Sequence, residues 1–311
     1  MSGISKKTIA VYSSAMIAMV FWSYSFIWYK DVFVFYKPIT LVLFRLVISS
    51  IFMFALTLSL NRLNPLKKKD IGNFLLLAFF EPFMYFIGES FGVNLIPSTL
   101  AAVIVATIPL FSPIGAYYFH DERISLMNFL GIVVSIIGVA IVIFYKGFVA
   151  IDANPYGVAL MFLAVLSALF YSVMIKKMVT RYNVLSVITY QNTFGIIFFI
   201  PTFFIFEFEH FKTVTITWAV LIPLLKLGIF ASSFAFIFFT FAMKNLGISK
   251  ANIFTNTIPV VTAVLAWIYL GEELNLTKVI GILVVIGGLF LSQFHPRMVT
   301  NLFSRNNNGE Y

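Results

Sequence analysis

The sequence contains no cysteine, and only 11% of its 311 residues are charged. Without cysteine, disulfides, thiol catalysis and cysteine-ligated metals are excluded. A soluble domain carries roughly 25% charged residues, so this chain has too few to cover a surface in water. Hydrophobic residues make up 61% of it, and its mean hydropathy is +0.99. These values indicate a protein whose outer surface faces lipid.

Enzyme motifs are also missing. The sequence has no HExxH, no GxxxxGK[ST] and no GxSxG. Its three histidines, His120, His210 and His295, are far apart and near predicted helix ends. We therefore predict no metal site, no cofactor and no catalytic residues. A membrane-embedded enzyme acting on lipid is the least favoured alternative, because it would need carboxylates or histidines clustered at one interface.

Long apolar stretches predict about ten transmembrane α-helices, since a helix needs roughly 20 apolar residues to span a bilayer. The predicted helices are residues 9–28, 38–60, 71–92, 97–119, 126–146, 155–175, 186–206, 216–242, 249–270 and 275–294. The expected fold class is an all-α integral membrane protein without a water-soluble domain. The polar tail, 296–311, is predicted to be disordered.

The net charge of +9 follows from where the basic residues lie. If the N-terminus is inside, most Lys and Arg fall in inner segments, such as Lys67, Lys68 and Lys69. This bias is the positive-inside rule, so both termini are predicted to be cytoplasmic. It explains the charge without a nucleic-acid partner. We expect a multi-pass protein of a bacterial inner (cytoplasmic) membrane, with its first helix retained.

An internal repeat appears when the sequence is shifted by 150 residues. The shift aligns Thr107-Ile108-Pro109 with Thr257-Ile258-Pro259, Glu122 with Glu272, Gly131 with Gly281, and Gly138 with Gly288. Shared Pro, Glu and Gly in one register predict two repeats, residues 1–147 and 148–295. Each repeat has five predicted helices, an odd number, so the second copy should insert upside down. Inverted repeats are typical of transporters, with the substrate site near the midplane.

The repeated motifs resemble a known family. They are TIP (107–109 and 257–259), an acidic loop (HDER at 120–123, GEEL at 271–274) and a glycine-rich helix (131–138 and 281–288), together with FWSYSF (21–26) and LFRL (43–46). This combination resembles the EamA-type transporters of the drug/metabolite transporter superfamily. The resemblance implies ten helices, alternating access and a central cavity lined mainly by helices 1, 3, 4, 6, 8 and 9. It does not specify a substrate.

Two charged residues of the predicted membrane interior are the first site candidates, because such residues are costly in lipid. Glu81 lies about ten residues into its helix from the inside, roughly 15 Å deep. Lys226 lies at a similar depth from the outside, in the equivalent helix of the other repeat. We predict that they face each other, and either pair or hold the two ends of a zwitterionic substrate. A fixed ion pair without substrate contact is the alternative.

Two further charges are predicted in helices. Glu89 follows Glu81 by eight residues and is expected near the outer end of the helix. It is either an interfacial carboxylate or a gating or coupling carboxylate that titrates during transport. Arg45 resembles the arginine of the family's second helix. We predict a structural role for it, through hydrogen bonds to neighbouring helix ends.

Polar and aromatic side chains complete the candidate site. Trp22, Tyr24 and Tyr85 lie deep enough to contact a substrate, and Tyr85 shares a helical face with Glu81. Asn252 and Asn256, four residues apart, must face protein or water. They either bond neighbouring helices or bind the substrate.

Two prolines and a second polar pair also allow more than one role. Pro109 and Pro259 stand at equivalent points of the two repeats and remove a helix hydrogen bond. They produce either simple kinks or hinges for gating. Gln191 and Asn192 form a polar spot in helix 186–206, which we expect to serve packing.

The function predicted from these observations is secondary transport of small metabolites by alternating access. We expect export of amino-acid-like solutes, with a small-molecule substrate and membrane lipid as partners. Coupling to protons or another ion gradient, or uncoupled efflux, is left open. The alternative is an exchanger or importer of phosphorylated metabolites such as nucleotide sugars, which would need a more basic cavity.

Overall fold

The structure is a computed structural model that describes residues 6–108, 110, 126–144, 154–246, 251 and 253–293. All regular elements in these residues are helices. Pro109, Asn252 and the tail 296–311 lie outside them, so the predictions made for these residues stay predictions.

The helices of the first half begin, in most cases, close to the predicted positions. They are α1 (Lys6–Phe33), α2 (Pro38–Ser59), η1 (Lys68–Asp70), α3 (Ile71–Ala78), η2 (Phe79–Met84), α4 (Tyr85–Leu95), α5 (Ser98–Val105) and α7 (Leu126–Ile143). However, α1 ends five residues later than predicted, and the helix predicted at 97–119 is described as α5 only to Val105. Proline sets two of these boundaries. Pro38 is the first residue of α2, and Pro97 precedes α5, because proline fits the first turn of a helix and not its interior.

The helices of the second half follow the same pattern. They are α8 (Pro155–Val179), α9 (Val184–Phe206), α10 (Phe208–Thr213), α11 (Trp218–Lys226), η3 (Leu227–Phe234), α12 (Ala235–Leu246), η4 (Ile253–Asn256), α14 (Thr257–Leu270) and α15 (Leu276–Gln293). Asn154 and Asn183 cap α8 and α9 with their side chains. Gly271 ends α14 with a φ of 66°, a left-handed conformation that glycine adopts without strain.

Six helices of the described residues are long and apolar enough to cross a membrane, and three shorter apolar helices accompany them. Their outward faces carry large apolar side chains, such as Leu126 (69% exposed), Ile205 (71%) and Trp218 (73%). In water such a surface would be unfavourable, but it matches a hydrocarbon solvent. The all-helical, multi-pass class predicted from composition is therefore confirmed. The count of ten spans and the orientation of the termini stay predictions.

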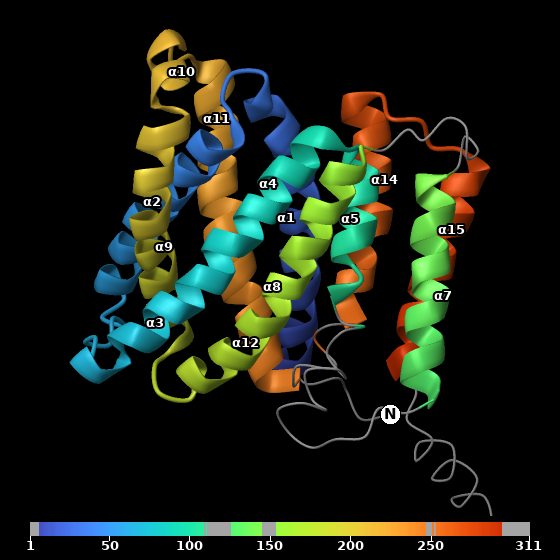
Figure 1. Ribbon diagram of the computed structural model, residues 1–311. Coiled ribbons are helices and arrows are strands. Elements are labelled where there is room, and N and C mark those ends of the chain that lie inside the picture. Colours follow the sequence, from blue (N-terminus) through green and yellow to red (C-terminus); the bar gives the residue numbers. More distant parts are fainter. Residues whose placement is uncertain are drawn as a thin grey trace, which may run out of the picture.

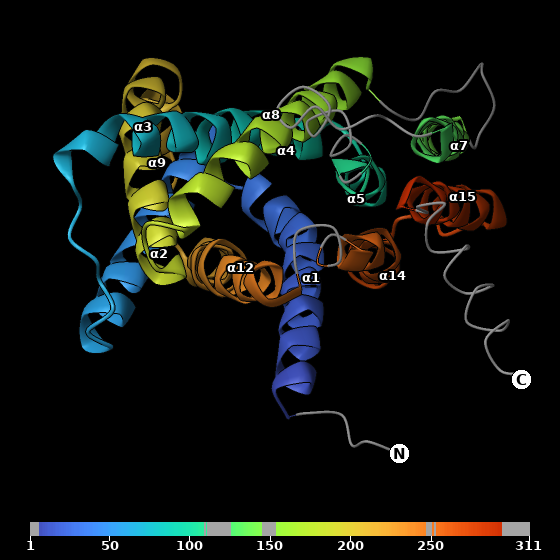
Figure 2. The same cartoon turned by 90° about the horizontal axis from the view of Figure 1, so that it is seen from below.

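The helices pack in pairs across the two halves. Helix α7 lies along α15 at one edge of the molecule, and α2 lies along α9 towards the other (Figure 1). Between them, α4 packs on α8, α1 packs on α12, and α5 packs on α14. Seen from below, α1 runs between α12 and α14 (Figure 2). Three of these contacts, α2–α9, α5–α14 and α7–α15, join equivalent helices of the two predicted repeats. The other two, α4–α8 and α1–α12, correspond to each other when the repeats are interchanged.

Glycines make the α7–α15 contact very close. A Cβ on Gly138 would lie 2.9 Å from the carbonyl oxygen of Gly281, and a Cβ on Gly288 would lie 2.7 Å from that of Gly131. The 150-residue shift converts one contact into the other, because Gly138 is equivalent to Gly288 and Gly131 is equivalent to Gly281. Small residues allow such close helix packing in lipid. This reciprocity is what a twofold relation between inverted repeats requires, although the inverted repeat itself remains a prediction.

Two predicted helices contain a wide-turn (π) segment where we expected uninterrupted α-helix. In the helix predicted at 71–92, the segment is η2, and Glu81 has the non-helical angles φ −145° and ψ 118°. Pro82 is the local cause, because it has no N–H to donate. In the helix predicted at 216–242, the segment is η3. There Ser233 donates a hydrogen bond to the carbonyl of Gly228 (2.9 Å), which competes with the regular backbone pattern.

Candidate functional site

Arg45 lies at the centre of a buried polar network between the two halves. Its guanidinium is 3.6 Å from Glu89 (Nη1 to Oε2), and the two side chains are 2% and 7% exposed. It also stacks over the ring of Phe86, with 4.2 Å from Cζ to the centroid. Arginine suits this position because its flat guanidinium combines hydrogen bonding with stacking. The ion pair joins α2 to α4.

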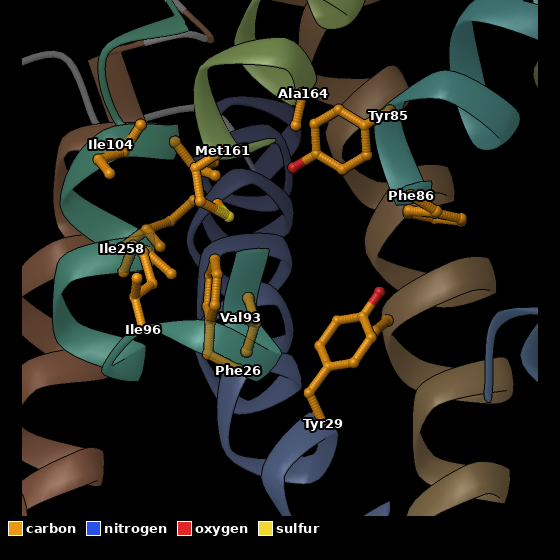
Figure 3. Close-up of a cluster of buried hydrophobic side chains, with 14 of the residues drawn as sticks. Phe26, Tyr29, Tyr85, Phe86, Val93, Ile96, Ile104, Met161, Ala164 and Ile258 are labelled. Carbon is orange, nitrogen blue, oxygen red and sulfur yellow. The ribbon is translucent and has the colours of Figure 1, made fainter. Parts of the chain in front are cut away.

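Two tyrosines complete the coordination of Glu89. Tyr29 of α1 donates to Glu89 Oε2 (2.8 Å), and Tyr85 of α4 donates to Oε1 (3.1 Å). Arg45 in turn donates from Nη1 to the Tyr29 hydroxyl (2.5 Å). Both tyrosines are otherwise surrounded by apolar side chains (Figure 3). A buried carboxylate is tolerated when an ion pair and several hydrogen bonds satisfy it.

The network continues into the second half of the chain. Arg45 Nε donates to Ser232 Oγ of η3. Ser49 of α2 shares a hydrogen bond of 2.7 Å with Ser233, and Asn192 of α9 donates to Ser49 Oγ (2.7 Å). These bonds place Arg45 between side chains in the middle of helices. We had expected it to bond neighbouring helix ends, so this part of the prediction was wrong.

Glu89 is likewise more deeply placed than expected. We placed it near the outer end of its helix, with an interfacial carboxylate as one reading. It is 5% exposed and paired with Arg45, which excludes the interfacial reading. The reason is that α4 packs against both α8 and α2, which sequence position alone does not reveal. Its gating or coupling role stays a prediction.

Glu81 has a different environment from Glu89. It is 5% exposed, yet its carboxylate accepts no hydrogen bond from the residues described. The charged groups that act on it are Glu89 and Arg45, and the hydroxyls within electrostatic range belong to Tyr85 and Tyr171. Its peptide is held from α8, where Ser167 donates to the carbonyl of Phe80 (2.6 Å). Glu81 is thus a buried, positioned and unpaired carboxylate.

Lys226 lies elsewhere than predicted. It ends α11 and is partly buried, with its ammonium 5.9 Å from the centroid of the Trp28 ring. The charged group it influences is Asp31, on α1. In the part of the chain that the structure describes, it forms no ion pair with Glu81. The predicted direct pair is therefore not formed in this structure.

The break at Glu81 explains this correction. The prediction assumed regular α-helices, in which depth and facing follow from residue number. The extended backbone of Glu81 and the π-turn after it change the direction of every side chain beyond them. Tyr85 accordingly bonds Glu89 and not Glu81, although it stands four residues after Glu81. Its predicted substrate contact remains untested.

The aromatic candidates of α1 divide between two neighbours. The Trp22 indole donates to the carbonyl of Ala231 in η3 (3.2 Å), and its ring packs edge-on against Phe239 of α12. Tyr24 stacks on Trp28, with centroids 5.5 Å apart, and faces Tyr269 of α14. Trp22 therefore lies beside the Arg45 network, whereas Tyr24 faces α14.

Asn256 is the candidate of α14 and η4 that the structure describes. It is 5% exposed, and neither atom of its amide has a hydrogen-bond partner among the described residues. Thr262, one to two turns further on, also has an unpartnered buried hydroxyl there. Pro259 is buried between them. Buried amides are normally satisfied, so Asn256 is available to a ligand or a water.

Two glutamates of the second half cap the N-terminal ends of two helices of the first half. Glu272 accepts from the backbone N–H groups of Ser98 (2.6 Å) and Thr99 (3.2 Å) at the start of α5. Glu207 accepts from the N–H groups of Ile39 (3.1 Å) and Thr40 (2.7 Å) at the start of α2. A carboxylate at a helix N-terminus satisfies free N–H groups and the helix dipole. These residues fix the packing at the helix ends.

No group of three or more His, Asp or Glu side chains that could hold a metal ion occurs in the described ranges. The carboxylates described above accept protein hydrogen bonds or stand alone. The site is built from one ion pair, one unpaired carboxylate, hydroxyls and amides. Such groups can bind and release a charged solute.

Sequence reasoning missed Tyr29 and Tyr171, and it interpreted Gln191 as packing. Tyr29 was missed because the predicted helix ended at residue 28, while α1 continues to Phe33. Tyr171 of α8 donates to Gln191 Oε1 of α9 (3.2 Å), and the η2 segment that carries Glu81 packs against both helices. A signal existed for Gln191, which is one of few amides in an apolar helix. None existed for Tyr171, because tyrosines are frequent in this chain.

Several proteins similar to this chain are named as transporters. The model of the EamA-like transporter family matches residues 9–144 and 155–294. "Uncharacterized transporter YetK" of Bacillus subtilis is 27% identical over 80% of this chain and 76% of its own. An "Uncharacterized transporter" of Archaeoglobus fulgidus is 26% identical over 88% and 95%. "Uncharacterized transporter YdfC" of B. subtilis is 24% identical over 96% and 95%.

A solved crystal structure has the same fold. It aligns with a TM-score of 0.67 at 16% identity and covers 91% of this chain and 98% of its own chain. At this identity the likeness concerns the fold alone. The family model, in contrast, matches most of the chain in two consecutive segments. This chain is therefore a membrane transporter protein that belongs to the EamA-like transporter family.

Proposed function

We propose that the protein is a secondary transporter that exports amino-acid-like solutes across the cytoplasmic membrane of a bacterium. Membership of a transporter family supports transport in general. The inner membrane and the cytoplasmic termini are supported by the distribution of Lys and Arg. The exported class is supported by the chemistry of the buried site.

The observation that carries the proposal is the unpaired carboxylate of Glu81 beside the Arg45–Glu89 ion pair. Ionisable residues inside a membrane are costly and mark substrate or ion pathways. A solute with an ammonium group would neutralise Glu81. Glu89 and the Tyr29 hydroxyl already engage Arg45, so the described residues leave no free guanidinium or ammonium beside Glu81 to bind a bulky anion.

Each candidate side chain has a proposed role. Glu81 holds the ammonium group, and the partly buried Lys226 attracts the carboxylate end of the solute from the outer side. Asn256 offers an unpartnered amide. Trp22, Tyr24 and Tyr85 supply aromatic surface. Asn252 lies outside the described residues, and its proposed role rests on its position four residues before Asn256 in the sequence.

Alternating access is the proposed mechanism. The contacts between equivalent helices, and the exchanged contacts α4–α8 and α1–α12, support two repeats that rock about a central axis. Pro109 and Pro259 are the proposed hinges, and Glu89 is the proposed gating or coupling carboxylate. Arg45 is proposed to be structural, because it links its own helix α2 to α1, α4 and η3 through Tyr29, Glu89 and Ser232.

Transport of phosphorylated metabolites is less well supported. Such a solute carries at least one further negative charge and needs free cations. In the described interior, Arg45 is engaged by Glu89, and Glu81 adds repulsion. No observation on the described residues favours this alternative.

The test is transport in proteoliposomes with a labelled panel of amino acids, amines and phosphorylated sugars. We expect one or more amino-acid-like solutes to move with the parent and to stop moving with Glu81→Gln and with Lys226→Met. The exposed ion pair of Lys212 and Glu209 provides matched controls, since Glu209→Gln and Lys212→Met should transport normally. Movement of only phosphorylated solutes, or normal transport by both site variants, would refute the proposal.

A further inference from the structure

A hydrogen-bond network ties the segment between α2 and α3 to the start of α9. The side-chain oxygen of Asn64 accepts from the Asn183 N–H (2.8 Å), and the Asn64 N–H donates to Ser186 Oγ (2.8 Å). The Asn64 carbonyl accepts from the Tyr190 hydroxyl (2.6 Å), and Ser186 donates to the carbonyl of Arg62 (3.0 Å). These bonds join residues 119 to 126 positions apart, one from each half of the chain. They lie at the end of the molecule opposite to α10 (Figure 1).

Asp70, directly before α3, strengthens this link. Its side chain is buried, at 1% exposure. It pairs with the guanidinium of Arg181 (2.6 Å) and accepts a hydrogen bond from the Tyr182 hydroxyl (3.0 Å). That hydroxyl in turn accepts from the backbone N–H of Lys67 (3.1 Å). The Arg181 side chain nevertheless remains 45% exposed, so the buried carboxylate fixes two loops whose basic side chains still reach the surface.

The linked segments carry a concentration of positive charge. In residues 60–72 and 177–186, Asp70 is the only acidic residue. The exposed basic residues of these segments, which we call the basic surface, are Arg62, Lys67, Lys68, Lys69, Lys177 and Arg181. Six positive charges and one negative charge leave a net charge of +5. Like charges that are held close together repel one another unless ions screen or neutralise them.

Membrane orientation does not require these charges to converge. The positive-inside rule depends on how many Lys and Arg each short loop contains, and not on where the loops lie after folding. In this structure, hydrogen bonds bring basic residues of two distant loops onto one surface and fix the backbone beneath them. Such a group of cations attracts a negatively charged partner.

The basic surface borders an apolar side of α3. Ile71, Leu76 and Phe79 are 36%, 47% and 36% exposed there, and a Cβ added to Gly72 would meet nothing within 4 Å. The positive charges therefore lie next to a face that is open to hydrocarbon. A partner that matches both parts has a negatively charged head and an apolar tail. A phospholipid has this form, whereas a soluble anion or a nucleic acid would leave the apolar part unmatched.

We propose that the basic surface binds the headgroup of an anionic phospholipid in the leaflet that it faces. In the predicted orientation, this is the cytoplasmic leaflet. The lysine ammonium groups contact the phosphodiester, and an acyl chain lies along the outward side of α3. The bound lipid neutralises the surface and reinforces the link between the two halves. Its binding does not depend on which solute the protein transports.

Lipid binding can be measured on the purified protein in detergent, where membrane orientation plays no part. Native mass spectrometry counts the lipids that remain bound when phosphatidylglycerol or phosphatidylcholine with the same acyl chains is added. We expect phosphatidylglycerol to bind more tightly, because only its headgroup carries a net negative charge. Its advantage should shrink as the ionic strength rises. Equal binding of the two lipids would overturn the proposal.

Matched double variants locate the site. Lys68→Gln with Lys69→Gln removes two charges of the basic surface, and Lys37→Gln with Lys212→Gln removes two exposed charges elsewhere. We expect the first pair to weaken phosphatidylglycerol binding roughly fivefold for each charge removed, and the control pair to leave it unchanged. Lys68→Arg with Lys69→Arg should keep the binding. An equal loss in both Gln pairs, or no loss in the first, would contradict the assignment. Equal Tm values without added lipid verify folding.

Two further arms test the shared surface and the need for an acyl chain. Lys177→Gln, in the other half of the chain, should also weaken phosphatidylglycerol binding roughly fivefold. No change in that variant would refute a surface that both halves form. Glycerophosphoglycerol, which is the same headgroup without acyl chains, should not displace the lipid at equal concentration, and neither should inorganic phosphate. Displacement by either would show that the surface takes a soluble anion, and the lipid proposal would then be wrong.

Discussion

Arg45 of α2 and Glu89 of α4 form a buried ion pair, with 3.6 Å between Nη1 and Oε2 and exposures of 2% and 7%. Tyr29 lies between them and bonds both. This arrangement joins three helices of the first half, and the bond from Arg45 to Ser232 joins them to the second. Among the described residues, it leaves Glu81 as a buried carboxylate that accepts no hydrogen bond.

Breaking this pair should destabilise the protein more than changing any surface charge. The variant Glu89→Gln leaves the Arg45 charge buried without its counter-ion, which costs about 3–5 kcal/mol. We expect a lower Tm in detergent by scanning fluorimetry. Glu209→Gln, which alters an exposed pair, should leave Tm unchanged. The double variant Arg45→Met with Glu89→Leu should be less destabilised than Glu89→Gln. An unaltered Tm in Glu89→Gln would show that the pair contributes little.

Two adjacent glycines of α15 should respond in opposite ways to alanine. A Cβ at position 288 would lie 2.6 Å from the backbone nitrogen of Ser135 and 2.7 Å from the Gly131 carbonyl, whereas one at 287 meets nothing within 4 Å. Gly288→Ala should therefore cost about 1–3 kcal/mol through overpacking. Gly287→Ala should be neutral or stabilise by up to about 1 kcal/mol. Thermal unfolding in detergent measures both, and equal Tm values would contradict the packing described for α7 and α15.

The Glu272 cap should control access to the start of α5. Glu272→Ala removes the acceptor of the Ser98 and Thr99 N–H groups, which costs about 0.5–2 kcal/mol and loosens this end. The absence of native cysteine makes a Thr99→Cys reporter specific. We expect maleimide to label Thr99→Cys faster when Glu272→Ala is also present than in the single variant. Adding the control substitution Glu209→Ala should not change the labelling rate. Unchanged labelling would mean that other contacts hold α5.

The predicted orientation can be tested with the same chemistry. Val34 and Leu60 are 77% and 53% exposed and flank α2 at opposite ends. With the N-terminus inside, Val34→Cys should react with an impermeant maleimide added to intact cells, and Leu60→Cys should react only after lysis. The reverse result would invert the topology. Reaction of both from outside would mean that α2 does not span the membrane.

The course of the chain was largely predictable. Proline at 38, 97 and 155 and glycine at 271 mark helix boundaries in the sequence, and they do so in the structure. The physical reason is local, since a helix in lipid must satisfy its own backbone hydrogen bonds. The EamA motifs could also be recognised from this single sequence, because the TIP motif, the acidic loop and the glycine-rich helix each occur twice in it.

The partners of the buried charges were not predictable in the same way. The sequence indicated Glu81, Glu89 and Arg45 as interior charges, but it suggested Lys226 as the partner of Glu81. The extended backbone at Glu81 and the packing of α2 on η3 decided otherwise. Both depend on contacts between distant segments.

The sequence by itself therefore determined that this protein is a helical membrane transporter and where most helices begin and end, and it indicated Glu81, Glu89 and Arg45 as interior charges. Apolar length, proline, glycine and basic loops carry that information residue by residue. Only the tertiary structure decided that Glu89 pairs with Arg45 and that no described residue pairs with Glu81. Pairing in the interior depends on the rotation of each helix about its axis, and a single break in the backbone changes that rotation for every residue beyond it.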